Sequence, residues 1–322
     1  MTTNEIIPVQ PLQIVTTDAR SLECNPAAVY LASLSESSRR PMRQALDNLA
    51  ERLTGSPDAF GCDWAGLRYQ HVNALRSWLA EKYKTATANR VLAALRGTLK
   101  SAWRLELITA EEYERAVDFK PVRGSSVPAG RELASGEMAA LMANCEADAT
   151  PAGRRDAALI AVGYSSGLRR AELVELDLAD LEPNSGKLLV RKGKGNKERV
   201  VYLTDGALDA LNDWLALRGA EPGPLFLPIR KGGAAVNRRM APQSVYDILA
   251  RRGGLAGVRA FSPHDLRRSF VSDLLEAGAD IATVAKLAGH SSVDTTARYD
   301  RRPEEAKQKA VGLLHVPYRR KG

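Results

Sequence analysis

A stretch without apolar periodicity, residues 118–132, constrains this chain most, because it separates two long parts that differ in their patterning. It contains two prolines, two glycines and two serines, a composition typical of a linker. A chain of 322 residues is long enough for two domains that each bury a core. We therefore expect a flexible arm over residues 1–24, a first domain over 25–117, the linker, and a second domain over 133–322.

The first part carries apolar residues at helical spacing in three segments, residues 42–53, 72–79 and 91–102. Thr109 and Glu112 form the sequence pattern of a capping box and predict the start of a fourth helix. No segment of this part alternates as a strand does. The first domain is therefore predicted to be a small helical bundle.

The second part contains two segments that alternate between apolar and polar residues, 187–191 and 199–203. Such alternation is typical of strands, and the Gly-Lys-Gly-Asn run at 193–196 is typical of a turn between them. Residues 225–227 suggest one more short strand, and the rest follows helical spacing, including an amphipathic tail helix at 303–314. The prediction is a mainly α two-domain chain, with a mixed α/β second domain around a small antiparallel sheet.

Residues 262–299 hold side chains suited to chemistry on a phosphate. His264 and Arg267 lie three residues apart near the start of a predicted helix and so share a face. Gly289 is expected to end the next helix and to place His290 in a sharp turn, and Tyr299 is expected about two turns into a third helix. Each residue alone is more often a cap, a surface charge or packing, so the signal is the set.

Two further positions precede this stretch. Arg169 directly follows a predicted turn at Gly167, and Glu172, three residues on, can hold its guanidinium or form an ordinary surface pair. Lys194 lies in the Gly-Lys-Gly turn, with Lys197 as a nearby alternative. This turn lacks the spacing of a nucleotide-binding phosphate loop and no helix follows it directly, which disfavours nucleotide hydrolysis.

In order and approximate spacing, these motifs resemble the tyrosine recombinase (phage integrase) family. The resemblance is strong over residues 130–305 and weaker, by helical pattern only, over 25–120. It identifies the first domain with a SAM-like core-binding domain and the second with a catalytic domain. The matching motifs are Gly167-Leu168-Arg169, Gly193-Lys194-Gly195-Asn196-Lys197-Glu198-Arg199, His264-Asp265-Leu266-Arg267, Leu287-Ala288-Gly289-His290 and Tyr299.

The resemblance implies a site-specific recombinase that cuts and rejoins DNA through a 3′-phosphotyrosine intermediate, in integration, excision or resolution of mobile DNA. Tyr299 would be the nucleophile, His264 its base and Lys194 the acid that protonates the leaving oxygen. Arg169, Arg267 and His290 would stabilise the phosphate oxygens, since guanidinium forks suit phosphate. Neither a metal, another cofactor nor ATP is then expected.

The charge balance agrees with a polyanionic partner. Lysine and arginine number 46 against 38 acidic residues, a net charge of 46 − 38 = +8, and the calculated pI is about 9.4. Ordinary solvated charge is about as good an explanation for basic residues on helices. The candidates for DNA contact are Arg39, Arg40, Arg43, Arg90, Arg96, Lys100, Lys192 and Lys197.

Double-stranded recombination sites are the partner that the resemblance implies, bound by four copies on two duplexes, with a monomer when free and with accessory DNA-bending proteins. The tail helix would pack either on its own chain or on a neighbouring copy. Three scattered cysteines form no zinc-binding spacing and indicate a reducing compartment. With no signal peptide and no membrane-spanning stretch, the expected location is cytoplasmic.

Three other readings remain open or are weaker. A type IB topoisomerase uses a similar residue set to relax supercoils, and a catalytically silent DNA-binding protein could keep the same fold. The two histidines of the stretch could also belong to a metalloenzyme. No further ligands stand at suitable spacing, which argues against that third reading.

Overall fold

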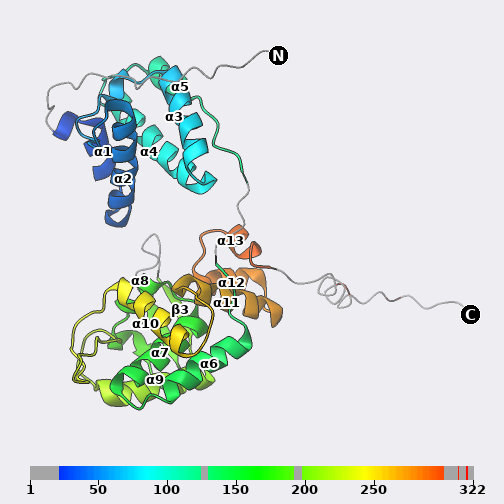
Figure 1. The fold of residues 1–322 in the computed structure, drawn as a ribbon. Helices are drawn as coiled ribbons and strands as arrows, with labels where there is room; N and C mark the ends of the chain where they lie inside the picture. Colours follow the sequence, from blue (N-terminus) through cyan, green and yellow to red (C-terminus); the bar gives the residue numbers. More distant parts are fainter. Residues whose placement is uncertain (1–21, 125–129, 192–197, 301–310, 312–316, 318–322) are drawn as a thin grey trace, which may run out of the picture. The chain divides into compact units, whose positions relative to one another are not determined.

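The computed structural model describes residues 22–124, 130–191, 198–300, 311 and 317. The chain divides into two compact units, Met1–Pro128 and Ala129–Gly322 (Figure 1). The described residues are mainly helical and contain one small antiparallel sheet, which lies in the second unit. The predicted fold class is therefore confirmed.

The first unit is a helical bundle built around one long helix. Its helices are α1 (Pro26–Ala32), α2 (Glu36–Thr54), α3 (Tyr69–Lys82), α4 (Thr85–Arg104) and α5 (Ala110–Val117), with 3-10 turns at Leu22–Cys24 and Trp64–Gly66. The other four helices all pack against α4, because α4 buries apolar residues along much of its length. Leu46, Trp64 and Leu95 are almost completely buried at the centre of this core.

Local signals explain where elements of this unit begin and end. The Thr109 hydroxyl accepts a bond from the Glu112 amide at 3.2 Å, and the Glu112 carboxylate accepts one from the Thr109 amide at 2.9 Å, so the predicted capping box starts α5. Within the stretch predicted as a linker, Phe119 is buried in the first core, and Val122 exchanges two main-chain bonds with the Asn89 side chain. Single anchors of this kind leave no periodic pattern in the sequence.

The second unit packs its helices around α7. They are α6 (Ser135–Glu146), α7 (Pro151–Ser166), α8 (Arg170–Glu175), α9 (Asp205–Arg218), α10 (Pro242–Leu255), α11 (Pro263–Glu276), α12 (Ile281–Ala288) and α13 (Val293–Ala297), with a 3-10 turn at Leu178–Asp180. Helices α6, α8, α9 and α11 contact α7, most of whose residues are buried. Leu159, Ile160 and Trp214 are fully buried in this core.

The sheet has the order β1-β2-β3, with strands β1 (Leu181–Glu182), β2 (Lys187–Val190) and β3 (Arg199–Tyr202). The predicted hairpin is the antiparallel pair β2–β3, with Leu188 opposite Val201. The predicted strand at 225–227 is wrong. Leu225 donates one bond to the Leu176 carbonyl at 2.8 Å, but the segment joins no sheet, because its apolar residues fill the core instead.

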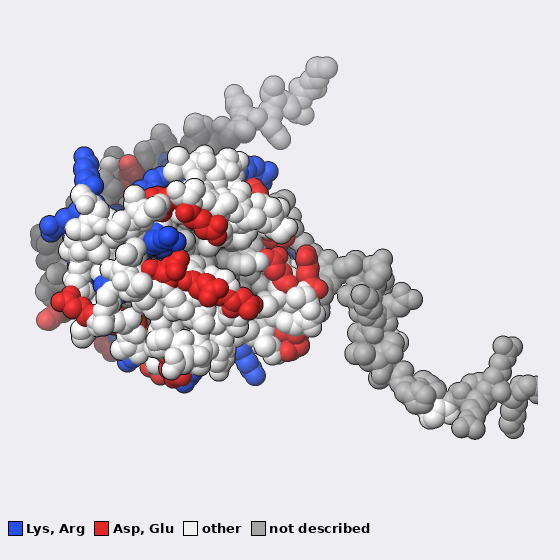
Figure 2. All heavy atoms as spheres, turned by 90° about the horizontal axis from the view of Figure 1, so that it is seen from below, with Lys and Arg blue, Asp and Glu red and all other residues white. Residues whose placement is uncertain are grey.

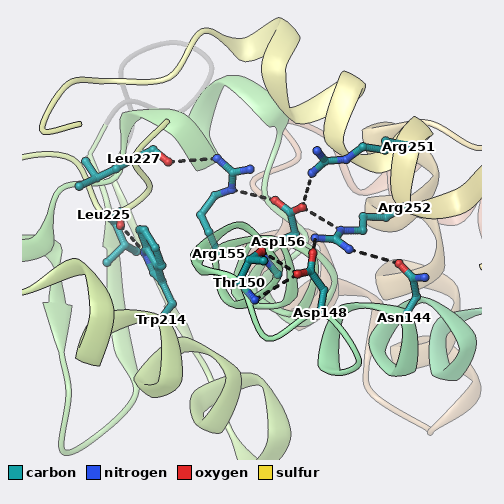
Figure 3. A network of polar contacts seen from close by, with 11 residues as sticks. Asn144, Asp148, Thr150, Arg155, Asp156, Trp214, Leu225, Leu227, Arg251 and Arg252 are labelled. Atoms are coloured by element: carbon teal, nitrogen blue, oxygen red, sulfur yellow. Dashed lines mark hydrogen bonds and ion pairs between the residues drawn. The ribbon is translucent and has the colours of Figure 1, made fainter. Parts of the chain in front are cut away.

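A buried ionic network ties α7 to α10 and to the loop after α6 (Figure 3). Asp156 is fully buried and accepts hydrogen bonds from Arg155 at 2.8 Å, Arg251 at 2.6 Å and Arg252 at 2.8 Å. Arg252 also donates to Asp148 at 2.6 Å. Each guanidinium thus contacts a carboxylate, which allows the charges of Arg155, Asp156 and Arg252 to lie in the interior, whereas Arg251 reaches the network from an exposed position.

Charge is uneven over the surface of the second unit. Figure 2 views this unit from the side on which α9 lies, and acidic side chains gather there in a band.

Candidate active site

Arg169 is positioned by a glycine turn between α7 and α8. Gly167 ends α7 with φ +59°, a conformation that glycine adopts without strain, and the Phe270 ring packs against it where a Cβ would stand. Nη1 of Arg169 donates to the Glu172 carboxylate at 2.7 Å, and Nη2 donates to the Gly289 carbonyl at 3.0 Å. These two bonds fix the guanidinium beside the end of α12.

Arg267 lies next to Arg169 and is 2% exposed. Its Nη1 donates to the Gly167 carbonyl at 2.6 Å, whereas its buried Nη2 has no hydrogen-bond partner among the described residues. Burial, and then the charge of Arg169, lowers the pKa of Arg267 to about 10, so the group stays protonated at neutral pH. A buried cation with an unused donor is a site at which an anion would be stabilised.

His290 follows Gly289, which ends α12 with φ +66°. The His290 amide donates to the Ala285 carbonyl at 2.9 Å, and its Nδ1 lies 2.7 Å from the hydroxyl of Thr296, which is fully buried. Burial, Arg267 and Arg169 lower the pKa of His290 to about 4. The ring is therefore neutral at pH 7, and its orientation is set by Thr296.

Tyr299 lies in the turn after α13 and not two turns inside a helix, as its spacing predicted. α13 ends at Ala297, and the Tyr299 amide donates to the Thr296 carbonyl at 2.9 Å. The only large apolar residue of α13, Val293, is 45% exposed, so no buried stripe extends the helix. The prediction that Tyr299 lies inside a helix was therefore wrong, because the helix ends before this residue.

The Tyr299 hydroxyl lies 3.5 Å from Nε2 of His264. Its ring stacks on that of His290 at 6.3 Å, and the Arg268 guanidinium lies 5.3 Å from its centre. Burial, and then the nearby Arg267 and Arg268, lowers the pKa of His264 below its usual range. The hydroxyl thus faces an imidazole that is neutral, and so able to accept a proton, at pH 7.

Taken together, α8, α11, α12 and the turn after α13 bring Arg169, His264, Arg267, His290 and Tyr299 to one place in the second unit. The sequence of residues 131–305 matches the phage integrase family. Tyrosine recombinase XerC of Natranaerobius thermophilus is 32% identical over 270 residues, which are 79% of this chain and 86% of that protein. This chain belongs to the phage integrase family of tyrosine recombinases.

Other relatives of this tyrosine recombinase agree with the family assignment. Tyrosine recombinase XerD of Pseudomonas aeruginosa is 32% identical over 264 residues, covering 80% of this chain and 85% of that protein. The fold resembles that of the XerH site-specific recombinase bound to a palindromic difH substrate, with TM-score 0.66, 19% identity, and 94% and 98% of the two chains covered. A lambda integrase dimer bound to a core site gives TM-score 0.62 at 15% identity, covering 85% and 93%.

Membership confirms the resemblance inferred from the motifs. The XerC and XerD relatives are site-specific recombinases, and DNA cleavage and ligation is the activity of the family. The predicted enzyme class is therefore confirmed. The roles of individual residues are a separate matter, which depends on the geometry above.

Two side chains at the site of this recombinase were not singled out from the sequence. Arg268 approaches the Tyr299 ring, and its only signal was its place directly after Arg267. Arg199 donates to the Glu172 carboxylate at 2.7 and 3.2 Å. It closes the Gly-Lys-Gly-Asn-Lys-Glu-Arg run, and by charge alone it could not be told from its basic neighbours.

The basic residues of the β2–β3 turn, Lys192, Lys194 and Lys197, lie outside the described residues. The strands that flank them are described, and β3 contacts α12. Their proposed roles thus depend on the motif and on the position of the hairpin.

The basic residues predicted to contact DNA in the first unit fall into two groups. Arg39, Arg43 and Arg96 donate hydrogen bonds within the unit, Arg43 to Asp47 at 2.8 Å and the other two to main-chain carbonyls. Such bonds hold these side chains against the first unit itself.

The other group is more open. Arg40 and Arg90 line a groove of about 360 Å³ between α2 and α4, and Lys100 is exposed further along α4. The remaining lining residues are Pro41, Gln44, Ala45, Asn48, Tyr83, Thr87 and Val91.

The described residues hold no group of three or more His, Cys, Asp or Glu side chains that could bind a metal ion. In the same part of the chain, no helix is long and apolar enough to cross a membrane.

Proposed function

We propose that this tyrosine recombinase breaks a DNA strand by attack of Tyr299 on phosphorus, which leaves the strand joined to Tyr299 as a 3′-phosphotyrosine. The observation that carries the proposal is the Tyr299 hydroxyl, 3.5 Å from a neutral His264 and beside the buried Arg267 with an unused donor. A nucleophile, a proton acceptor and a buried cationic donor lie together.

The direction of proton transfer follows from the protonation states of Tyr299, which is a neutral phenol, and His264, which is a neutral imidazole. A phenol attacks poorly below its pKa near about 10, so a base must accept its proton as the bond to phosphorus forms. His264 Nε2, 3.5 Å from the hydroxyl, is that base, since catalytic hydrogen bonds are often long before substrate binds and tighten in the complex. Lys194 protonates the 5′ oxygen as its bond to phosphorus breaks, as the family motif implies.

The phosphate oxygens gain charge in the transition state, and fixed donors lower the barrier there. Arg267 offers Nη2, and Arg169 sits beside it with a guanidinium that suits two oxygens at once. Neutral His290 donates from Nε2 if the Thr296 hydroxyl donates to Nδ1, a tautomer that the 2.7 Å contact allows. These three groups bind one scissile phosphate.

Double-stranded DNA is the proposed partner, and the structural relatives support it: XerH is bound to difH and lambda integrase to a core site. In the first unit, Arg40 and Arg90 are the best placed candidates to contact the duplex, because their groove is open. The phosphotyrosine keeps the energy of the broken bond, so the 5′-hydroxyl of a second strand can complete an exchange. Exchange of mobile DNA, by four copies on two duplexes, is the use that the family resemblance implies.

A suicide substrate tests the chemistry. Nicked duplexes that carry sequence from beside the coding region are incubated with wild type and with Tyr299→Phe, and covalent protein–DNA products are separated under denaturing conditions. A 5′-labelled strand should become attached to wild type and not to the variant, because attack leaves the 3′ phosphate on the tyrosine. A 3′-labelled fragment should be released with a free 5′-hydroxyl.

Other outcomes identify the alternatives. Attachment of the 3′-labelled fragment would reject the proposed polarity. Specific binding with no covalent product from either protein would favour the silent DNA-binding protein. Supercoil relaxation that depends on Tyr299 but not on sequence would favour the topoisomerase.

A further inference from the structure

Arg199, at the start of β3, contacts two parts of the active site, although it was not among the candidate catalytic residues of its motif. Its side chain is 10% exposed. Nη2 and Nη1 donate to the two oxygens of Glu172 at 2.7 and 3.2 Å, and Nε donates to the Leu287 carbonyl at 2.9 Å. One guanidinium therefore joins β3, α8 and α12.

Both of its partners lead directly to proposed phosphate ligands. The Glu172 carboxylate that Arg199 holds also accepts from Nη1 of Arg169 at 2.7 Å and from the Arg169 amide at 3.0 Å. Leu287 lies in the last turn of α12, immediately before the Gly289–His290 turn. A Cβ on Gly289 would meet the Arg199 guanidinium at 2.9 to 3.1 Å, so the turn packs against this group.

The charges explain why this contact matters for anion binding. If Glu172 faced Arg169 alone, the carboxylate would be free to close on it with both oxygens and neutralise it. Arg199 engages both oxygens, and burial, which by itself raises the pKa of Glu172, is outweighed by the bonds from Arg199 and Arg169, so that the carboxylate stays charged. Arg169 keeps a defined orientation and an excess of positive charge beside Arg267.

We propose that Arg199 is a positioning residue for strand cleavage. It sets the separation and orientation of Arg169, through Glu172, and of the His290 turn, through the Leu287 carbonyl, and it does not touch DNA itself. This inference rests on the proposed function of the same site.

A matched control exists in the same unit. Arg239 also joins a carboxylate and a main-chain carbonyl, donating to Asp177 at 2.6 Å and to the Val174 carbonyl at 2.7 Å. Its bonds reach the far end of α8 and no proposed phosphate ligand. Arg239→Gln therefore removes a comparable set of contacts with no route to the chemistry.

The experiment measures single-turnover cleavage of the suicide substrate at saturating DNA, together with DNA affinity in a Tyr299→Phe background. Arg199→Gln should slow cleavage about 10²-fold, the usual result of misplacing catalytic groups by about 1 Å, while the Kd changes less than about threefold. Arg239→Gln should leave the cleavage rate within about twofold of wild type. Arg199→Lys should recover the charge but little of the rate, because an ammonium lacks the planar fork.

A spectroscopic readout separates positioning from general loss of stability. Arg199 contributes to the lowered pKa of His290, so Arg199→Gln should raise the pKa of His290 in an NMR titration of the ring, and Arg239→Gln should not. If Arg199→Gln fails to fold, Arg199→Lys and Arg239→Lys provide the same comparison.

If wild type cleaves the substrate and Arg199→Gln or Arg199→Lys cleaves it at the same rate, the Arg199 inference alone would be overturned. A loss of affinity as large as the loss of rate would also overturn it, because Arg199 would then be a DNA contact. No covalent product from wild type would instead overturn the proposed function.

Discussion

The second unit contains two clusters of buried or half-buried arginines. The two clusters have similar composition but differ in how far carboxylates balance the positive charge. In the Asp156 network, Arg155, Arg251 and Arg252 meet two carboxylates, Asp148 and Asp156 (Figure 3). Both carboxylates are bonded within the network, and each of the three guanidinium groups donates to Asp156.

In the other cluster, the proposed anion site, Arg169 and Arg199 both donate to the Glu172 carboxylate, whereas Arg267 donates to the Gly167 carbonyl. Nη2 of Arg267 is buried without a partner among the described residues, and the pKa of Arg267 is lowered. Burying an arginine therefore does not by itself mark a functional site. What distinguishes the anion site is a surplus of cations that an incoming phosphate would compensate.

The largest effect should come from exchanging one arginine of each cluster for a residue of similar volume without charge. Arg267→Met should reduce cleavage about 10³-fold, because a fixed donor to the phosphate is lost. Its melting temperature should stay equal to wild type or rise, since an incompletely paired buried charge disappears.

Arg252→Met provides the matched control. It leaves Asp148 and Asp156 short of a partner, and breaking a buried pair costs about 3–5 kcal/mol, or roughly 10 °C in a unit of this size. Cleavage per folded molecule should be unchanged. Equal losses of melting temperature in the two variants would show that the clusters do not differ as we describe.

Much of the fold was accessible from the sequence because its signals are local. Helical spacing, the Thr109 capping box and the alternation of residues 187–191 and 199–203 each report on neighbouring residues. The failures share a cause as well. Strand β1 is too short to alternate, and the apolar run 225–227 looks like a strand but owes its burial to packing.

The features of the site also divide into those that local sequence patterns predict and those that depend on packing between distant elements. The motif spacing led to Arg169, His264, Arg267, His290 and Tyr299, which the structure brings together from four elements.

What spacing could not show is the pairing between elements. Arg199 bonds to Glu172 from 27 residues away and to Leu287 from 88, and a basic residue in a basic hairpin carries no mark of either contact. The unused donor of Arg267 likewise follows only from burial.

An intermediate effect should appear as a difference in the pH range over which each cluster loses stability. The folded pKa of His290, about 4, lies below its ordinary 6.5, so the unfolded chain binds the proton first. Its contribution is present above pH 6.5 and is lost as the pH falls toward 4. For Asp148, hydrogen bonds from Thr150 and Arg252 lower the pKa to about 2, below its ordinary 3.8, so its contribution persists to lower pH and is lost between 3.8 and 2.

Melting temperatures measured from pH 7 to pH 2 check this. His290→Asn should reduce the slope between pH 6.5 and 4 and leave the acidic end unchanged. Asp148→Asn should do the reverse. If His290→Asn retained the whole wild-type slope above pH 4, the anion site would not be the source of that pH dependence.

The smallest effect should be stabilisation by a simple divalent anion. Sulfate mimics the phosphate in charge and shape, so at about ten times its Kd it should stabilise the wild type by about 1.4 kcal/mol, or roughly 3–5 °C. Sulfate also stabilises proteins generally by exclusion from their surface, so the informative quantity is the difference between variants at equal ionic strength. Arg252→Met should keep the full increment, because each guanidinium of the Asp156 network already donates to a carboxylate. Arg267→Met should lose the increment. An equal increment in both variants would mean that the surplus charge at Arg267 does not attract an anion.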